Sequence, residues 1–204
     1  MKILVTRPKH DKANHYLYYW TQEIVDLGRK KLASVFDLEK EKSSRKNVQS
    51  YIKKGVADII LLNGHGDDSS VFGHNNEEIL STGDDLSNLR GKIIFIRACR
   101  AAVTLGPTMI KEGAKSVIAY KEDFNFFHKK DMLHRPLEDS YARPFFECSN
   151  QVAISLVKGH TAKEANEMSR VKYEKEIAQS LNSEKESSFL PFLMQNMQNQ
   201  VCLE

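Results

Sequence analysis

Residues 92–102 read KIIFIRACRAA, an apolar run that ends abruptly at Cys99 among small residues. A continuous apolar run of this length is typical of a parallel strand that is buried on both faces of its sheet. The carboxyl ends of such strands form the edge at which open α/β sheets bind ligands. The stretch therefore predicts a parallel sheet with the Cys99 thiol at its rim.

A second apolar run lies upstream, where residues 58–66 read DIILLNGHG. Two neighbouring parallel strands end at the same edge, so we expect His65 to lie beside Cys99. A thiol attacks a carbonyl as the thiolate and needs a base within hydrogen-bond reach. We therefore predict Cys99 as nucleophile, His65 as general base, and the backbone N–H groups of Gly66 and Cys99 as an oxyanion hole.

A simpler interpretation of the same residues stays open. A cysteine at a strand end is commonly a small buried hydrophobic residue, and a histidine between glycines can belong to an ordinary turn. The chain would then be an unrelated α/β ligand-binding domain in which Cys99 is structural. The occurrence of both residues at the ends of apolar runs favours the catalytic interpretation.

The remaining patterns predict strands alternating with helices, which indicates a mainly parallel sheet of about five to six strands with helices on both faces. We treat residues 1–204 as a single domain. The expected strands are 2–6, 32–38, 58–62, 92–96, 116–120 and 200–203, with a hairpin over 69–80. The expected helices are 11–27, 48–56, a short one from the capping box at 82–85, 105–112, 137–157 with a kink at Pro144, 161–181 and 189–197, with a polar linker over 182–188.

The composition of the chain bears on its partners and its cellular location. The chain has 204 residues, 41% hydrophobic and 28% charged, and a formal net charge of +3, which gives no reason to expect a nucleic-acid or membrane partner. We find no secretory signal and no apolar stretch near the roughly 20 residues of a membrane helix. Three widely spaced cysteines form neither a disulfide framework nor a zinc motif, which favours a reducing, cytoplasmic location.

Neither a cofactor nor a metal is expected. The histidines outside the pair show no metal-ligand spacing with cysteines or carboxylates; these are His74, His128, His134 and His160. The expected partners are a protein or peptide substrate and a regulatory protein.

Residues 97–101, RACRA, are close to the caspase signature QACRG. With the His-Gly after one strand and the Ala-Cys after the next, the chain resembles the caspase-like cysteine peptidase clan, which includes caspases, metacaspases, clostripain, gingipains and bacterial CHAT domains. Residues 84–89 and 113–120 are similar to the CHAT domain. Ala101 stands where caspases have glycine, a change that is tolerated if the backbone there has a negative φ.

The resemblance implies a three-layer α/β/α caspase-like fold and a cysteine-type endopeptidase, a hydrolase with His65 as base and Cys99 as nucleophile. The first alternative is a catalytically inactive member of the same fold that works as an interaction module.

Arg97 lies two positions before Cys99, so on a strand both side chains share one face. In the resembled peptidases this position often lines the pocket for the residue before the cut, and an arginine predicts an acidic residue there. The alternative is an internal ion pair with Asp37, Asp67 or a similar carboxylate. For Asp67 and Asp68 three roles stay open: orienting His65, lining a pocket for a basic residue, or forming a solvated turn.

Residues 121–136 are long, aromatic and charged. Loops of this length in a compact domain are commonly functional or mobile. We expect this segment to cover the substrate groove and to be partly mobile.

Overall fold

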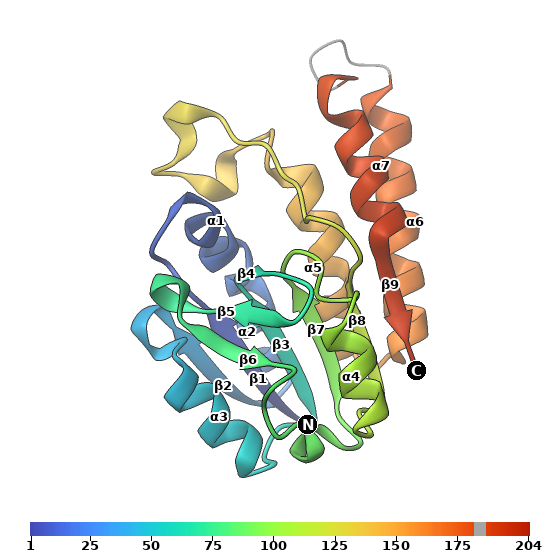
Figure 1. Ribbon diagram of the computed structural model, residues 1–204. Helices are drawn as coiled ribbons and strands as arrows, with labels where there is room; N and C mark the ends of the chain where they lie inside the picture. The colour runs from blue at the N-terminus through green and yellow to red at the C-terminus, as the bar shows by residue number, and fades with distance from the viewer. Residues whose placement is uncertain (182–186) are drawn as a thin grey trace.

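The computed structural model describes residues 1–181 and 187–204. Its centre is a six-stranded sheet in the order β2-β1-β3-β7-β8-β9 (Figure 1). The first five strands are parallel and β9 is antiparallel to β8. Their bounds are β1 Lys2–Arg7, β2 Ser34–Glu39, β3 Ile59–Asn63, β7 Ile93–Arg97, β8 Ser116–Tyr120 and β9 Gln200–Leu203. The predicted mainly parallel sheet is confirmed.

Helices cover both faces of this sheet, because alternate side chains of each buried strand point to opposite sides. The helices are α1 Lys12–Trp20, α2 Gln22–Lys30, α3 Arg45–Lys53, α4 Leu105–Lys111, α5 Arg143–Val157, α6 Ala162–Ser180 and α7 Leu190–Asn199. Ile60 and Ile94 pack with residues of α3 and α4, whereas Leu61 and Phe95 pack with residues of α2, α5 and α6. The result is the expected three-layer α/β/α arrangement.

A small antiparallel sheet follows β3 and consists of β4 His65–Gly66, β5 Ser70–Phe72 and β6 Glu78–Ser81. The predicted hairpin is therefore confirmed. His65 lies in β4, a short third strand that the sequence patterns did not predict. Gly64 joins β3 to β4. A Cβ atom there would lie 2.0 Å from the carbonyl oxygen of Phe72, so only glycine lets the chain turn at this point.

The predicted helix over 11–27 is divided into α1 and α2 at Thr21. The buried Thr21 hydroxyl donates to the Leu17 carbonyl and accepts a hydrogen bond from Arg97. A hydroxyl that bonds the preceding turn competes with regular helical bonding. The apolar stripe of the sequence is continuous across the break, so the pattern alone did not indicate it.

Two other helix predictions are wrong in their details. Helix α5 begins at Arg143 and not at residue 137, so Pro144 lies in its first turn, where a missing N–H costs nothing, and it causes no kink. Residues 82–85 form a turn in which the Asp84 carboxylate accepts the Ser81 N–H, followed by a short 3-10 turn Ser87–Leu89.

The C-terminal elements agree with the sequence patterns. The capping box of Thr161 and Glu164 opens α6, and Gln200–Leu203 forms the terminal strand β9. Of the predicted linker over 182–188, residues 182–186 lie outside the described residues. Among the described helices, none has the length and apolar character needed to cross a membrane.

Candidate active site

Strands β3 and β7 are direct neighbours, paired in register from Ile59 with Ile93 to Asn63 with Arg97. Both strands therefore end level at one edge of the sheet. His65 follows β3 by two residues and Cys99 follows β7 by two. Both side chains line a single small cavity of about 40 Å³. The structure thus places the two predicted residues together.

His65 is held by Asp11, a residue to which the sequence assigned only a helix start. The Asp11 Oδ2 atom lies 2.6 Å from Nε2 of His65, while Oδ1 accepts the Asn14 N–H and caps α1. Burial alone would raise the pKa of Asp11, but the hydrogen bonds from Asn14 and His65 outweigh it and lower that pKa. The signal available in the sequence was an aspartate just after the first strand, but the adjacency of β1 and β3 was needed to interpret it.

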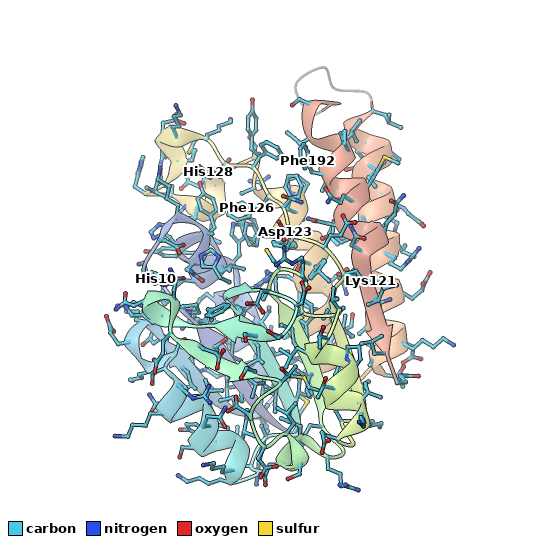
Figure 2. All side chains as sticks on the ribbon, in the orientation of Figure 1. His10, Lys121, Asp123, Phe126, His128 and Phe192 are labelled. Atoms are coloured by element: carbon cyan, nitrogen blue, oxygen red, sulfur yellow. The ribbon has the colours of Figure 1, made fainter. Side chains whose placement is uncertain are left out.

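His10 approaches the same carboxylate. Its Nε2 atom lies 3.2 Å from Oδ2 of Asp11, and its ring lies edge-on to His65 with centroids 6.2 Å apart. His10, Asp11 and His65 each offer one ligand atom within 4.8 Å of the others. Figure 2 labels His10 beside α1. These are the residues at the site with the chemistry to hold a metal.

Cys99 is half-buried and its thiol pKa is raised, chiefly by burial. After burial, the Phe124 N–H has the next largest effect and lowers this pKa. The Asp123 carboxylate raises the pKa, and the Arg100 charge lowers it by a smaller amount. Across residues 1–181 and 187–204, no hydrogen bond joins Cys99 to His65. The thiol is therefore protonated at neutral pH in this conformation.

The backbone turns sharply after Cys99. Arg100 has a φ of 53°, in the left-handed region that non-glycine residues rarely adopt. Ala101 is outside that region, so the condition for alanine in place of the caspase glycine is met. The Arg100 Nε atom donates to Asp68 at 2.7 Å, and the Asp68 carbonyl accepts the N–H groups of Thr104 and Leu105. These contacts tie the turn after Cys99 to the loop after β4.

The two predicted oxyanion donors lie close together. A Cβ atom on Gly66 would lie 2.8 Å from the Cys99 carbonyl oxygen and 3.3 Å from its nitrogen. In the described parts of the chain, the Cys99 N–H donates to no protein acceptor. That N–H is therefore available to a bound group, and the oxyanion role of both residues stays a prediction.

Asp67 forms a local turn, since its Oδ1 atom accepts the N–H groups of Ser69 and Ser70 at 2.8 Å each. The role of orienting His65 belongs to Asp11 and not to Asp67. Asp68 is half-exposed and pairs with Arg100. Substrate contacts of Asp67 and Asp68 stay a prediction.

Arg97 is 1% exposed and lies on the floor of the cavity. Its guanidinium donates to Asn63, Asn150 and Thr21 at 3.0, 2.6 and 2.7 Å. Burial lowers the pKa of Arg97 to about 10. The alternative of an internal ion pair is wrong, because these partners are neutral, Asp37 pairs with Arg7, and Asp67 accepts the N–H groups of Ser69 and Ser70. The role of Arg97 in a pocket for an acidic residue stays a prediction.

The segment over 121–136 contributes two residues to the lining of the cavity. It passes over the carboxyl ends of β7 and β8 (Figure 1), and Phe124 and Phe126 line the cavity. Both rings pack on Phe146 of α5, with centroids 5.9 and 4.7 Å away. Figure 2 labels Asp123 and Phe126 along this segment. Its partial mobility stays a prediction.

No family model and no curated protein matches this sequence. Among solved structures, the chain is similar to the Arg-specific cysteine proteinase gingipain R, with a TM-score of 0.61 and 12% sequence identity over 98% of this chain and 45% of that one. It is also similar to the complex of the RgpB pro- and mature domains of Porphyromonas gingivalis, with a TM-score of 0.52, 12% identity and coverage of 86% and 44%. The chain thus spans less than half the length of either neighbour, and the likeness establishes the caspase-like fold.

Proposed function

We propose that this protein is a cysteine endopeptidase in which Cys99 is the nucleophile and His65 the general base. The observation that supports the proposal is the shared cavity: two neighbouring parallel strands end level, and both residues line the cavity beyond their ends. The similarity in fold to a cysteine proteinase supports the same reaction class.

The contacts of His65 suggest how the reaction would run. Its Nε2–H donates to Asp11, which leaves the Nδ1 lone pair to accept the thiol proton of Cys99. The thiolate then attacks the peptide carbonyl carbon, and the oxyanion accepts hydrogen bonds from the N–H groups of Cys99 and Gly66. The C–N bond then breaks as the leaving amine takes the proton from His65. In the second step His65 deprotonates a water molecule, which hydrolyses the thioester and releases Cys99.

The conformation described here is a closed one. A cavity of about 40 Å³ is close to the space of a single water molecule, roughly 30 Å³, whereas ligand pockets measure about 300–1,000 Å³. A peptide therefore requires the segment bearing Phe124 and Phe126 to move away. Opening would also hydrate Cys99 and remove the burial that raises its pKa.

Specificity for an acidic residue before the cut is a further part of the proposal. Arg97 lines the cavity, and within the described chain three of its five N–H groups donate to protein acceptors. An adjacent hollow of about 350 Å³ favours the opposite preference, because Glu122 and Asp123 line it with Arg100. Profiling on a peptide library, with Cys99→Ala as the blank, decides between them: cleavage after Lys or Arg overturns the acidic preference.

The second candidate function is an inactive interaction module of the same fold. The raised pKa of Cys99 and its lack of a hydrogen bond to His65 favour it. A peptidyl ketone that labels Cys99, with labelling lost in His65→Ala, supports the peptidase. Cys202, which is half-buried and outside the cavity, serves as the internal control for general thiol reactivity. Equal labelling of Cys99 in the parent and in His65→Ala favours the module.

The cellular setting is also proposed and not established. The three cysteines are free, which supports a reducing compartment such as the cytoplasm. The covered cavity supports control by a regulatory protein that displaces the segment over 121–136. Neither point depends on the identity of the substrate.

A further inference from the structure

One oxygen of the Asp11 carboxylate has three nitrogen atoms around it. Its Oδ2 atom faces Nε2 of His65 at 2.6 Å, the Asn14 side-chain amide at 3.0 Å and Nε2 of His10 at 3.2 Å. An ionised carboxylate oxygen offers about two lone-pair sites, so three donors compete for this atom. Two imidazole nitrogens and one carboxylate oxygen therefore lie within 4.8 Å of one another.

His10 is placed as a ligand would be. Its side chain is 11% exposed, and its Nδ1 atom is buried without a partner among the residues described. His74 packs edge-on against its ring with centroids 5.3 Å apart, which limits how far the ring can turn. The Nε2 atom of His10 also lies 3.1 Å from Oδ1 of Asn76, a contact that a metal ion at this nitrogen would replace.

We propose that His10, Asp11 and His65 bind one divalent transition-metal ion of the Zn²⁺ type. Zinc lies about 2 Å from nitrogen and oxygen ligands, so tetrahedral ligand atoms are about 3.3 Å apart. The 3.2 Å between His10 and Asp11 already fits, and the 2.6 Å between His65 and Asp11 must lengthen by about 0.7 Å. The ligand nitrogens of His10 and His65 lie within 4.8 Å of each other and must also stand about 3.3 Å apart. Three protein ligands leave a fourth position open to water. Two imidazoles select a transition ion over Ca²⁺ or Mg²⁺, which prefer all-oxygen sites.

The surrounding charges permit a cation. Two lysines flank His10 and Asp11 in the sequence. Lys12 is exposed, and the Lys9 ammonium is directed elsewhere: it donates to the Tyr19 hydroxyl and lies over the rings of Tyr18 and Tyr19 at 4.7 and 4.4 Å. Arg7 is paired with Asp37. The Asp11 charge therefore remains available to the ion.

Metal binding has a consequence for catalysis, and this consequence rests on the proposed function. The ion takes the ring nitrogen of His65 that otherwise donates to Asp11, and its charge disfavours the imidazolium that a general base must form. A metal ion at this site would therefore inhibit peptide cleavage, and His10, which lies outside the catalytic dyad, would be one of its ligands.

The experiment separates metal binding from peptidase activity. Zn²⁺ binding is measured by calorimetry in the Cys99→Ala protein, and Co²⁺ binding by its visible spectrum. We expect one ion per chain, with at least tenfold weaker binding in Cys99→Ala carrying His10→Ala or Asp11→Ala. His160→Ala is the matched control, because His160 is exposed and outside the cluster. Circular dichroism verifies that each variant is folded. If a variant does not fold, His10→Asn in the Cys99→Ala protein is measured in its place.

Each outcome is decisive. Three results would contradict the metal site. The first is an unchanged Zn²⁺ affinity in the His10 variants, and the second is a lack of Zn²⁺ binding in the protein that carries only Cys99→Ala. The third is an affinity for Ca²⁺ equal to that for Zn²⁺. Inhibition of peptide cleavage by Zn²⁺, measured in the otherwise unchanged chain and weakened at least tenfold by His10→Ala, supports the inhibitory role. If the protein binds Zn²⁺ through His10 but cleaves no peptide, the metal site is supported and the proposed peptidase function is contradicted.

Discussion

Asp11 and His65, which are 54 positions apart in the chain, are joined by a contact of 2.6 Å between Oδ2 and Nε2. The other oxygen of the same carboxylate accepts the Asn14 N–H at 2.8 Å and caps α1. One side chain therefore orients the proposed base and starts the helix beside it. The two roles use different oxygens and can be separated by mutation.

Asp11→Asn separates them, because asparagine caps a helix about as well as aspartate. We expect unchanged thermal stability and a loss of about 10- to 100-fold in kcat, since a neutral amide stabilises the His65 imidazolium less than a carboxylate does. Asp11→Ala removes the cap as well and should cost about 1 kcal/mol of unfolding free energy. Equal kcat in the parent and Asp11→Asn contradicts the orienting role.

Asp123→Asn tests the charge beside the nucleophile. The negative charge of Asp123 raises the Cys99 thiol pKa, so its removal lowers that pKa and increases the thiolate fraction at neutral pH. We expect faster alkylation of Cys99 by iodoacetamide near pH 7, approaching roughly tenfold for a one-unit fall in pKa. Mass spectrometry of the Cys99 peptide across a pH series measures the change.

The matched control for Asp123→Asn is Asp131→Asn, an exposed aspartate on the same segment. It should leave the pH profile of Cys99 alkylation unchanged. Cys202 gives an internal reference, because burial raises the pKa of its thiol to about 11. A profile that shifts to higher pH in Asp123→Asn contradicts the assigned sign.

Arg97→Ala tests whether the buried guanidinium supports the fold. The substitution leaves Asn63, Asn150 and Thr21 without their donor in a site that is 1% exposed. Each unsatisfied buried group costs about 1–3 kcal/mol, so we expect a loss of about 3 kcal/mol or more in unfolding free energy, measured by urea denaturation.

Arg143→Ala is the comparison for that loss, because Arg143 is exposed and lies 4.0 Å from Glu147. It should change stability by less than about 0.5 kcal/mol. If Arg97→Ala does not fold, Arg97→Lys, which keeps a charge but offers fewer fixed donors, should still be destabilised. Stability equal to the parent in both Arg97 variants rules out the structural role.

Gly66→Ala tests the close approach of β4 to the nucleophile. The added Cβ would lie 2.8 Å from both the Ala98 Cβ and the Cys99 carbonyl oxygen, so β4 or the Cys99 turn must shift. We expect peptide cleavage to fall by tenfold or more as the oxyanion donors separate. Gly83→Ala is the control, since its nearest neighbour would be a side-chain atom at 3.8 Å. Unimpaired cleavage in Gly66→Ala argues against the oxyanion hole.

Much of the fold followed from local patterns. Apolar runs over 58–62 and 92–96 became β3 and β7 because strands buried on both faces need continuous apolar sequence. The capping box at Thr161 opened α6 because its hydrogen bonds join residues three apart. Such features depend on near neighbours, and so the sequence alone indicates them.

The break at Thr21 did not follow, because one of the two hydrogen bonds of its hydroxyl comes from a residue far away in the chain. Arg97 donates to the Thr21 hydroxyl across 76 positions, and a single side chain on β7 thereby shapes the end of α1. The neutral partners of Arg97 were likewise hidden, since Asn150 comes from α5. Contacts of this kind arise only when the layers pack.

By itself, the sequence determined the parallel α/β architecture and the placement of His65 and Cys99 at strand ends, because hydrophobic periodicity and glycine turns are local properties of the chain. The tertiary structure alone decided that β1 lies beside β3, which brings His10 and Asp11 to His65. It also decided that Phe124 and Phe126 close the cavity over Cys99. Strand order and segment packing depend on the free energy of burying whole surfaces together, and no single stretch of sequence records that balance.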